Sequence, residues 1–170
     1  MSGNLITIIC SNYNSIEWVE GYCNAINSQL LSEFDLVVCD ANSDDGSREF
    51  FKKYKFREGI KVIFRDYKSR IGIYEAWNGA LDEASTPYIM NVNTDDRLFP
   101  GALTTMLGYA VTRPDIDVFY SRCLVTEDKD HSTIVQLYDW PEYSHENMLK
   151  QCLCGPFPLL KREAIVKVGN

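Results

Sequence analysis

Short apolar runs alternate with longer amphipathic stretches along the first two thirds of the chain. Runs rich in β-branched and other apolar residues predict strands at 5–10, 34–40, 60–65 and 88–92. Apolar positions at helical spacing predict helices at 16–31, 48–54, 73–84 and 101–113. This alternation predicts an α/β fold with a mostly parallel, Rossmann-like sheet and helices on both of its faces.

The last third of the chain is less regular. Its pattern predicts a strand at 117–124 and a weaker strand at 133–138, which we expect to form a hairpin or an edge pair. Helical spacing returns at 146–151 and 161–168. No repeat, low-complexity tract or linker interrupts the sequence, so we expect a single domain over residues 1–170.

Composition narrows the classes of function. The formal net charge of −7 argues against nucleic acid as a partner, because phosphate backbones require a basic surface. No apolar run is long enough for a transmembrane segment, and the N-terminus lacks a signal-peptide pattern. The six cysteines include no Cys-x-x-Cys pair. These features together favour a cytoplasmic protein, and they leave its oligomeric state open.

The tetrad Asn93-Thr94-Asp95-Asp96 directly follows the predicted strand 88–92. Ligands of open α/β sheets bind at the carboxyl ends of the strands, and two adjacent carboxylates placed there repel each other. Mg²⁺ is a simple compensation, since it binds through one or two carboxylates together with substrate phosphates. The tetrad is therefore a candidate metal–diphosphate site. Taken alone, it would be better explained as a solvated turn in which Arg97 pairs with the carboxylates.

Other polar residues follow the remaining strands of the predicted sheet. Ser11 and Tyr13 come after the first strand, Asp40 ends the second, and Arg70 lies in the loop after the third. In a parallel sheet these residues converge on Asp95 and Asp96. No glycine-rich dinucleotide or P-loop motif is present, so any phosphate binding would depend on a metal ion.

Four segments, in this order, resemble family 2 glycosyltransferases, which have the GT-A fold. They are Ile8-Ile9-Cys10-Ser11-Asn12-Tyr13-Asn14, the loop segment 37–47, Gly72-Ile73-Tyr74-Glu75-Ala76-Trp77-Asn78-Gly79-Ala80, and Val92-Asn93-Thr94-Asp95-Asp96, an Asn-x-Asp-Asp version of the DxD motif. A looser resemblance covers 138–169. The segments span roughly the first hundred residues, and their order makes the resemblance specific.

The resemblance implies a role for each residue. Ser11, Tyr13 and Asp40 would hold the nucleotide, with the Tyr13 ring able to stack on a base and Asp40 able to accept from a pyrimidine N–H. Packing for Tyr13, and a turn or helix-cap role for Asp40, are open alternatives. Arg70 would meet the nucleotide or a phosphate, or it is a surface charge.

The acidic tetrad would hold the metal. Asp95 would lie near the ribose and diphosphate, and Asp96 would ligate Mg²⁺ or Mn²⁺ and so stabilise the leaving group. Asn93 belongs to the same nucleotide-binding group and stands where many relatives carry Asp, which would lower the affinity for the metal.

The implied activity is hexosyl transfer from a nucleotide-diphosphate sugar, a UDP-sugar, to the hydroxyl of a carbohydrate or other acceptor, with inversion. Residues 1–97 would form the nucleotide-sugar-binding half, and 98–170 an incomplete acceptor-side half. Inversion needs a general base, and none of Asp139, Glu142 and Glu146 matches the family position. We therefore expect a C-terminally truncated chain or a short member. The alternative is a catalytically incomplete nucleotide-sugar-binding or scaffold module.

Overall fold

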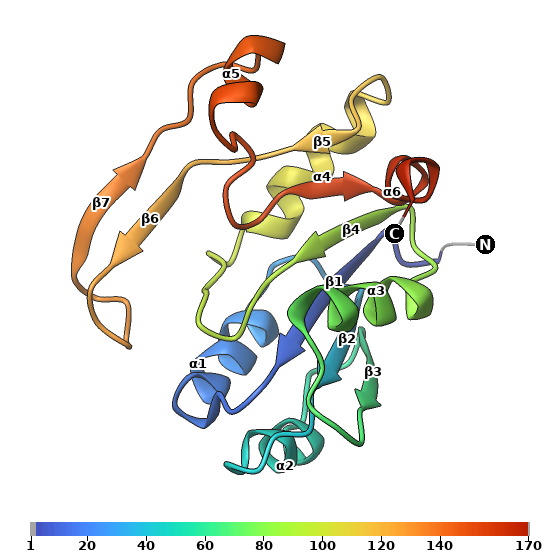
Figure 1. The fold of residues 1–170 in the computed structure, drawn as a ribbon, viewed down its shortest axis with the longest axis vertical. Helices are drawn as coiled ribbons and strands as arrows, with labels where there is room; N and C mark the ends of the chain where they lie inside the picture. Colours follow the sequence, from blue (N-terminus) through green and yellow to red (C-terminus); the bar gives the residue numbers. More distant parts are fainter. Residues whose placement is uncertain (1–2, 170) are drawn as a thin grey trace.

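A computed structural model describes residues 3–169 of the chain (Figure 1). These residues form a six-stranded sheet, a separate two-stranded sheet and six helices. The elements are β1 (Ile6–Asn12), α1 (Ile16–Asn27), β2 (Phe34–Asp40), α2 (Ser47–Lys53), β3 (Ile60–Asp66), α3 (Ile73–Glu83), β4 (Tyr88–Asn91), α4 (Ala102–Thr112), β5 (Val118–Phe119), β6 (Cys123–Thr126), β7 (Ile134–Tyr138), α5 (His145–Lys150), β8 (Leu159–Lys161) and α6 (Arg162–Val168).

The main sheet has the strand order β3-β2-β1-β4-β8-β5. Strands β3, β2, β1 and β4 are parallel, and β8 runs antiparallel between β4 and β5. The α/β fold with a mostly parallel sheet is therefore confirmed. Because β1 and β4 are neighbours, the loops that follow them leave the same edge of the sheet side by side.

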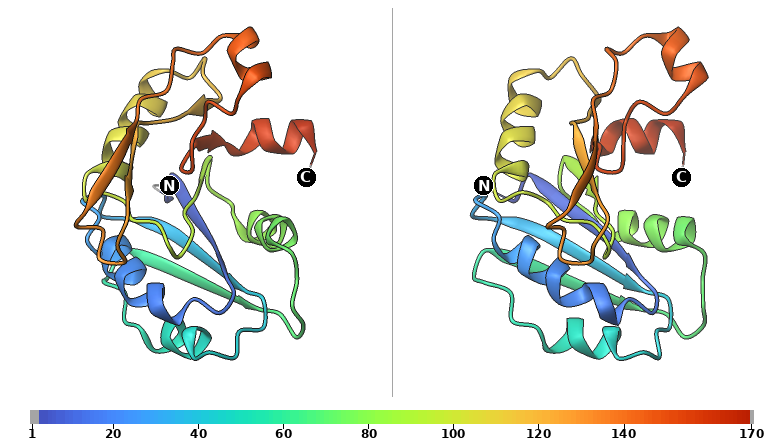
Figure 2. Two further views of the ribbon diagram at one scale, coloured as in Figure 1. Left: turned by 60° about the vertical axis from the view of Figure 1, so that its left-hand side comes forward. Right: turned by 90° about the vertical axis from the view of Figure 1, so that its left-hand side faces the viewer.

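Helices cover both faces of the sheet, as expected (Figure 2). Helices α1, α2 and α4 pack on one face through the larger core, to which α1 contributes Val19, Tyr22, Cys23 and Ile26 at helical spacing. Helix α3 covers the other face with Ala76, Ala80 and its C-cap residue Ala84, and α6 adds Ile165. Alternate residues of β1 face these two cores, which explains its continuous apolar run.

The first helix is shorter than the predicted 16–31, since α1 ends at Asn27. Beyond it the chain turns to meet the loop before α4, where the backbone N–H of Leu30 donates to the carbonyl of Pro100. The buried Gln29 side chain donates to the carbonyls of Phe99 and Ala25. The contacts with Phe99 and Pro100 are tertiary, so helical spacing alone overestimated the length of the helix.

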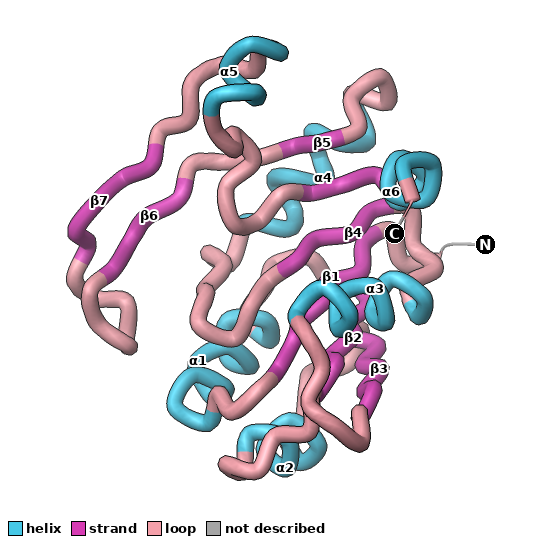
Figure 3. Tube along the Cα trace, in the orientation of Figure 1, coloured by secondary structure: helices cyan, strands magenta, loops and turns pink. Residues whose placement is uncertain are grey.

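The predicted strand 117–124 was also wrong as a single element. It forms two strands in different sheets, with β5 pairing with β8 and β6 pairing with β7. The β6–β7 hairpin confirms the expected pairing of 133–138, and it stands apart from the main sheet (Figure 3). Strand β8 was missed, because three residues flanked by Pro158 and a helix carry no periodic signal.

None of the helices in the part of the chain that the structure describes is long and apolar enough to cross a membrane. All six cysteines are free thiols.

The turn before β3 requires glycine at position 59. Its φ of +92° lies in the left-handed region, and a Cβ atom there would overlap the carbonyl oxygen of Ser32. We expect Gly59→Ala to lower the free energy of unfolding by about 1–3 kcal/mol, measured by urea denaturation. Gly101→Ala is the control, since an added Cβ meets nothing within 4 Å there. Equal midpoints for the two variants would contradict this interpretation of the turn.

Candidate functional site

A cavity of about 710 Å³ lies at the carboxyl edge of the parallel strands. It is lined from the loops after β1, β2, β3 and β4, by residues that include Ser11, Tyr13, Ala41, Arg70 and Asp95. Five of the predicted site residues border it together, namely Ser11, Tyr13, Arg70, Asn93 and Asp95. The topology thus unites positions that are far apart in sequence. Asp40 and Asp96 are not among the lining residues.

A second hollow of about 590 Å³ lies at the opposite edge of the sheet, between residues 85–88 and α6. Lys161, Arg162 and Lys167 border it, but none of the predicted site residues does. The candidate site is therefore the cavity at the carboxyl edge.

Tyr13 and Arg70 meet at this cavity. The guanidinium carbon of Arg70 lies 4.5 Å from the centroid of the Tyr13 ring, within the range of a cation–π contact. The Tyr13 side chain is exposed, so packing in the core is not its role. The pair places an aromatic surface and a positive charge in one wall of the cavity.

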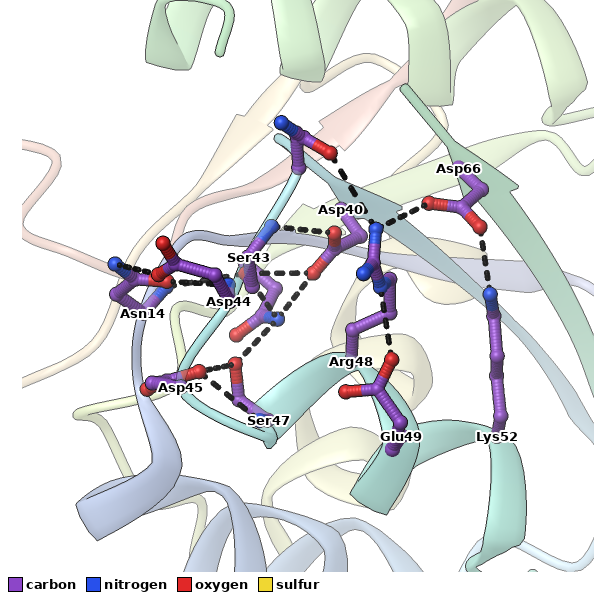
Figure 4. Close-up of polar contacts among 12 residues, drawn as sticks. Asn14, Asp40, Ser43, Asp44, Asp45, Ser47, Arg48, Glu49, Lys52 and Asp66 are labelled. Atoms are coloured by element: carbon purple, nitrogen blue, oxygen red, sulfur yellow. Dashed lines mark hydrogen bonds and ion pairs between the residues drawn. The ribbon is translucent and has the colours of Figure 1, made fainter. Parts of the chain in front are cut away.

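Asp40 is fully buried and shapes the loop that follows β2 (Figure 4). Its carboxylate accepts hydrogen bonds from Asn12 Nδ2 at 2.6 Å, from the backbone N–H of Ser43 at 2.9 Å and from Ser43 Oγ at 2.8 Å. Buried carboxylates need such donors, since an unpaired charge in the interior is costly. These contacts show Asp40 stabilising the turn after β2, which is one of the two alternatives that the sequence left open. Direct contact between Asp40 and a nucleotide stays a prediction.

Asn12 is a functional candidate that the sequence interpretation missed. Its buried side-chain amide donates to Asp40, Ser43 and Ser47, and its Oδ1 accepts from Ser15 Oγ. These bonds tie the end of β1 to the loop after β2. Asn12 and Ser15 themselves border the cavity. The available signal was an Asn two residues beyond the predicted apolar strand 5–10.

The acidic loop after β4 carries Asp95 and Asp96, whose side chains differ in exposure to solvent. Asp95 is exposed and borders the cavity, whereas Asp96 is partly buried beside it. Among the ion pairs of residues 3–169, none joins either carboxylate to Arg97. The guanidinium of Arg97 instead donates to backbone carbonyls. The alternative of a turn neutralised by an internal ion pair is therefore wrong.

Burial and charge repulsion outweigh the favourable contacts of Asp96 in this loop. Burial, and secondly the neighbouring charge of Asp95, raise the pKa of Asp96 to about 6. The side-chain oxygen of Asn93 is buried without a hydrogen-bond partner in the described structure. Carboxylate and amide oxygens are the ligands that a hard divalent cation prefers, so the chemistry of these side chains fits such an ion.

The donor set also fits the way in which Mg²⁺ and Mn²⁺ bind with phosphates. Residues 3–169 contain no group of three or more His, Cys, Asp or Glu side chains that could hold a metal by themselves. A cation here would take few protein ligands and would complete its shell from phosphate and water oxygens, which is the usual arrangement in sites that bind metal and phosphate together.

The chain belongs to glycosyl transferase family 2, whose family model matches residues 7–168. The resemblance stated from the four sequence segments is confirmed by this match.

Curated relatives are larger proteins. The chain is 32% identical over 104 residues to teichoic acid poly(glycerol phosphate) polymerase of Staphylococcus epidermidis, covering 61% of the chain and 14% of that protein. It is 26% identical over 157 residues to UDP-Glc:alpha-D-GlcNAc-diphosphoundecaprenol beta-1,3-glucosyltransferase WfgD of Escherichia coli, covering 91% of the chain and 59% of the relative. The chain therefore spans less than two thirds of either.

Solved structures confirm the GT-A fold. The mannosyltransferase PcManGT from Pyrobaculum calidifontis, in complex with GDP-Man and Mn²⁺, matches with a TM-score of 0.72 at 19% identity, over 97% of this chain and 46% of that one. S. aureus TarS 1–349 in complex with UDP-GlcNAc matches with a TM-score of 0.61 at 22% identity, over 68% and 33%.

The raised pKa of Asp96 predicts a stability effect with a definite sign. An Asp whose folded pKa of about 6 exceeds its unfolded value of about 3.9 binds its proton more tightly when folded, so the fold loses stability as pH rises through this window. In metal-free buffer at pH 8 we expect Asp96→Asn to raise the free energy of unfolding by on the order of 2 kcal/mol, and the gain should vanish near pH 4.

Urea denaturation at both pH values checks this prediction. Asp82→Asn on α3 is the control, because that side chain is exposed and should change stability by less than about 0.5 kcal/mol. An Asp96→Asn variant that is less stable than the parent at pH 8 would show that the carboxylate is not under electrostatic strain.

Proposed function

We propose that this chain acts as an inverting glycosyltransferase. It would bind a nucleotide-diphosphate sugar and transfer the sugar to an acceptor hydroxyl. The observation that carries the proposal is the single cavity in which Tyr13, Arg70 and Asp95 meet at the carboxyl ends of the sheet. Membership of the family supports the reaction class, and the residues that line the cavity support our assignment of the donor to it.

The nucleotide would occupy the Tyr13 side of the cavity. The Tyr13 ring offers a stacking surface, Ser11 offers a hydroxyl, and Arg70 offers a charge that suits a phosphate. Asp40 has all its observed acceptor contacts inside the protein, so its part is to fix Asn12 and the loop at Ala41, which border the cavity. Uridine is the proposed base, in line with the UDP-sugars named for WfgD and TarS.

The diphosphate would lie against the acidic loop. Asp95 and Asp96 would hold Mg²⁺ or Mn²⁺, and the buried, unpartnered side-chain oxygen of Asn93 offers a further oxygen in the same loop. When bound, the ion would neutralise the charge that grows on the departing nucleoside diphosphate. The Mn²⁺ named for PcManGT, which shares the fold, supports this assignment.

The acceptor would be a carbohydrate or another hydroxyl compound, placed by residues 98–170. Inverting transfer requires a base that removes the acceptor proton. Asp95 is the only carboxylate residue among the lining of the cavity that the described structure forms, and it is already assigned to the metal. This observation favours a second candidate function, a donor-binding module without turnover. Transfer or hydrolysis of a UDP-sugar by residues 1–170 would exclude that module.

Titration of UDP by calorimetry, with and without Mn²⁺, tests donor binding. We expect Mn²⁺ to tighten UDP binding by about tenfold or more, because it bridges the carboxylates and the diphosphate. The double variant Asp95→Asn/Asp96→Asn should lose this gain.

The matched control is Asp82→Asn/Glu83→Gln, an exposed acidic pair at the end of α3 that does not border the cavity. It should bind UDP as the parent does. If Mn²⁺ made no difference to the parent, or if the Asp95 and Asp96 double variant kept the full gain, the metal–diphosphate assignment would be wrong.

A further inference from the structure

Arg97 lies behind the acidic loop and binds only backbone. Its Nη1 donates to the carbonyls of Thr94 and Asp96, both at 2.8 Å, and its Nη2 donates to the carbonyl of Trp18 at 2.9 Å. The first two bonds close the loop onto itself, and the third ties the loop to α1. One guanidinium therefore joins two segments that are 79 positions apart in sequence.

Both segments are walls of the candidate cavity. Thr94 and Asp95 border it from the acidic loop, and Trp18 borders it from α1, whereas Arg97 itself is not in the lining. Any ligand held by the loop thus depends on a geometry that Arg97 sets from outside. A lysine could not replace it, because only the planar guanidinium presents several donors in a fixed fork.

Gly21 makes room for this guanidinium on α1. A Cβ atom at Gly21 would lie 2.5 Å from Arg97 Nη2 and 2.9 Å from its Nε. Glycine inside a helix costs about 1 kcal/mol relative to alanine. The backbone of Gly21 is not in the left-handed region, so conformation does not require glycine there. Access of Arg97 to the Trp18 carbonyl is the reason that the structure supplies.

We propose that Arg97, admitted by Gly21, is a positioning residue that holds Asp95 and Asp96 in the geometry required to bind a divalent metal together with a diphosphate. The inference rests on the proposed function. Residues that orient metal ligands without touching the metal typically change metal affinity by about 10–100-fold when they are replaced.

The experiment measures one ratio, the dissociation constant of UDP without Mn²⁺ divided by that with Mn²⁺. In Arg97→Ala, Arg97→Lys and Gly21→Ala we expect this ratio to fall by about tenfold, while UDP binding without metal stays unchanged. Gly21→Ala is the sharpest variant, since it leaves the arginine in place and adds helix propensity that partly offsets the lost contacts of Arg97, so its thermal midpoint should fall less than that of Arg97→Ala. If Arg97→Ala fails to fold, the ratio measured for Gly21→Ala still tests the proposal.

Two controls separate positioning from stability. Gly108→Ala on α4 adds the same methyl group to a helix where nothing lies within 4 Å. Arg57→Lys disturbs another arginine that binds backbone carbonyls, those of Leu31 and Gln29, away from the cavity. Gly108→Ala should change neither the ratio nor the fold, and Arg57→Lys should lower the thermal midpoint without changing the ratio.

The double variant Gly21→Ala/Arg97→Ala should lose no more of the ratio than Arg97→Ala alone, because both changes remove the same contacts. An unchanged ratio in Gly21→Ala and Arg97→Lys overturns the positioning role while leaving the proposed function intact. A parent protein that binds UDP equally well with and without Mn²⁺ overturns the metal–diphosphate assignment and the positioning role with it, whereas a parent that binds no UDP overturns the proposed function.

Discussion

Two neighbouring carboxylates stand at the carboxyl end of β4, and no ion pair within residues 3–169 neutralises them. The cost of this arrangement is visible in the raised pKa of Asp96, which follows first from burial and then from Asp95. A ligand that binds only the folded state can offset such a cost by mass action. The fold therefore keeps two carboxylates close together at a cost in stability, and a bound cation would reduce that cost.

Hydrogen bonds fix the loops that border the cavity, and Arg97 fixes the acidic loop itself. On one side, Asn12 and Asp40 fix the loops after β1 and β2 through buried hydrogen bonds. On the other side, Arg97 fixes the acidic loop through its carbonyls rather than through its carboxylates. Because Arg97 binds carbonyl oxygens, it fixes the acidic loop without pairing with the carboxylate of Asp95 or Asp96.

The sequence was sufficient for what depends on local pattern and on general rules of sheet topology. The four parallel strands are continuous apolar runs, and the rule for their carboxyl ends placed Ser11, Tyr13, Arg70 and Asp95 at one cavity. It was insufficient where tertiary contacts decide. The end of α1 at Asn27, the division of 117–124 between two sheets and the strand β8 depend on distant partners. The same holds for Arg97, which the sequence suggested as an ion-pair partner and which the structure shows bound to backbone.

A crystal grown with UDP and Mn²⁺ and measured for anomalous scattering would test the metal bridge directly. We expect one strong manganese peak between the Asp96 carboxylate and the diphosphate oxygens, at a metal–oxygen distance of about 2.0–2.2 Å, near the Mg²⁺–oxygen value. A diphosphate bound in the cavity with no manganese peak beside Asp95 or Asp96, or a peak elsewhere on the protein, would contradict the assignment.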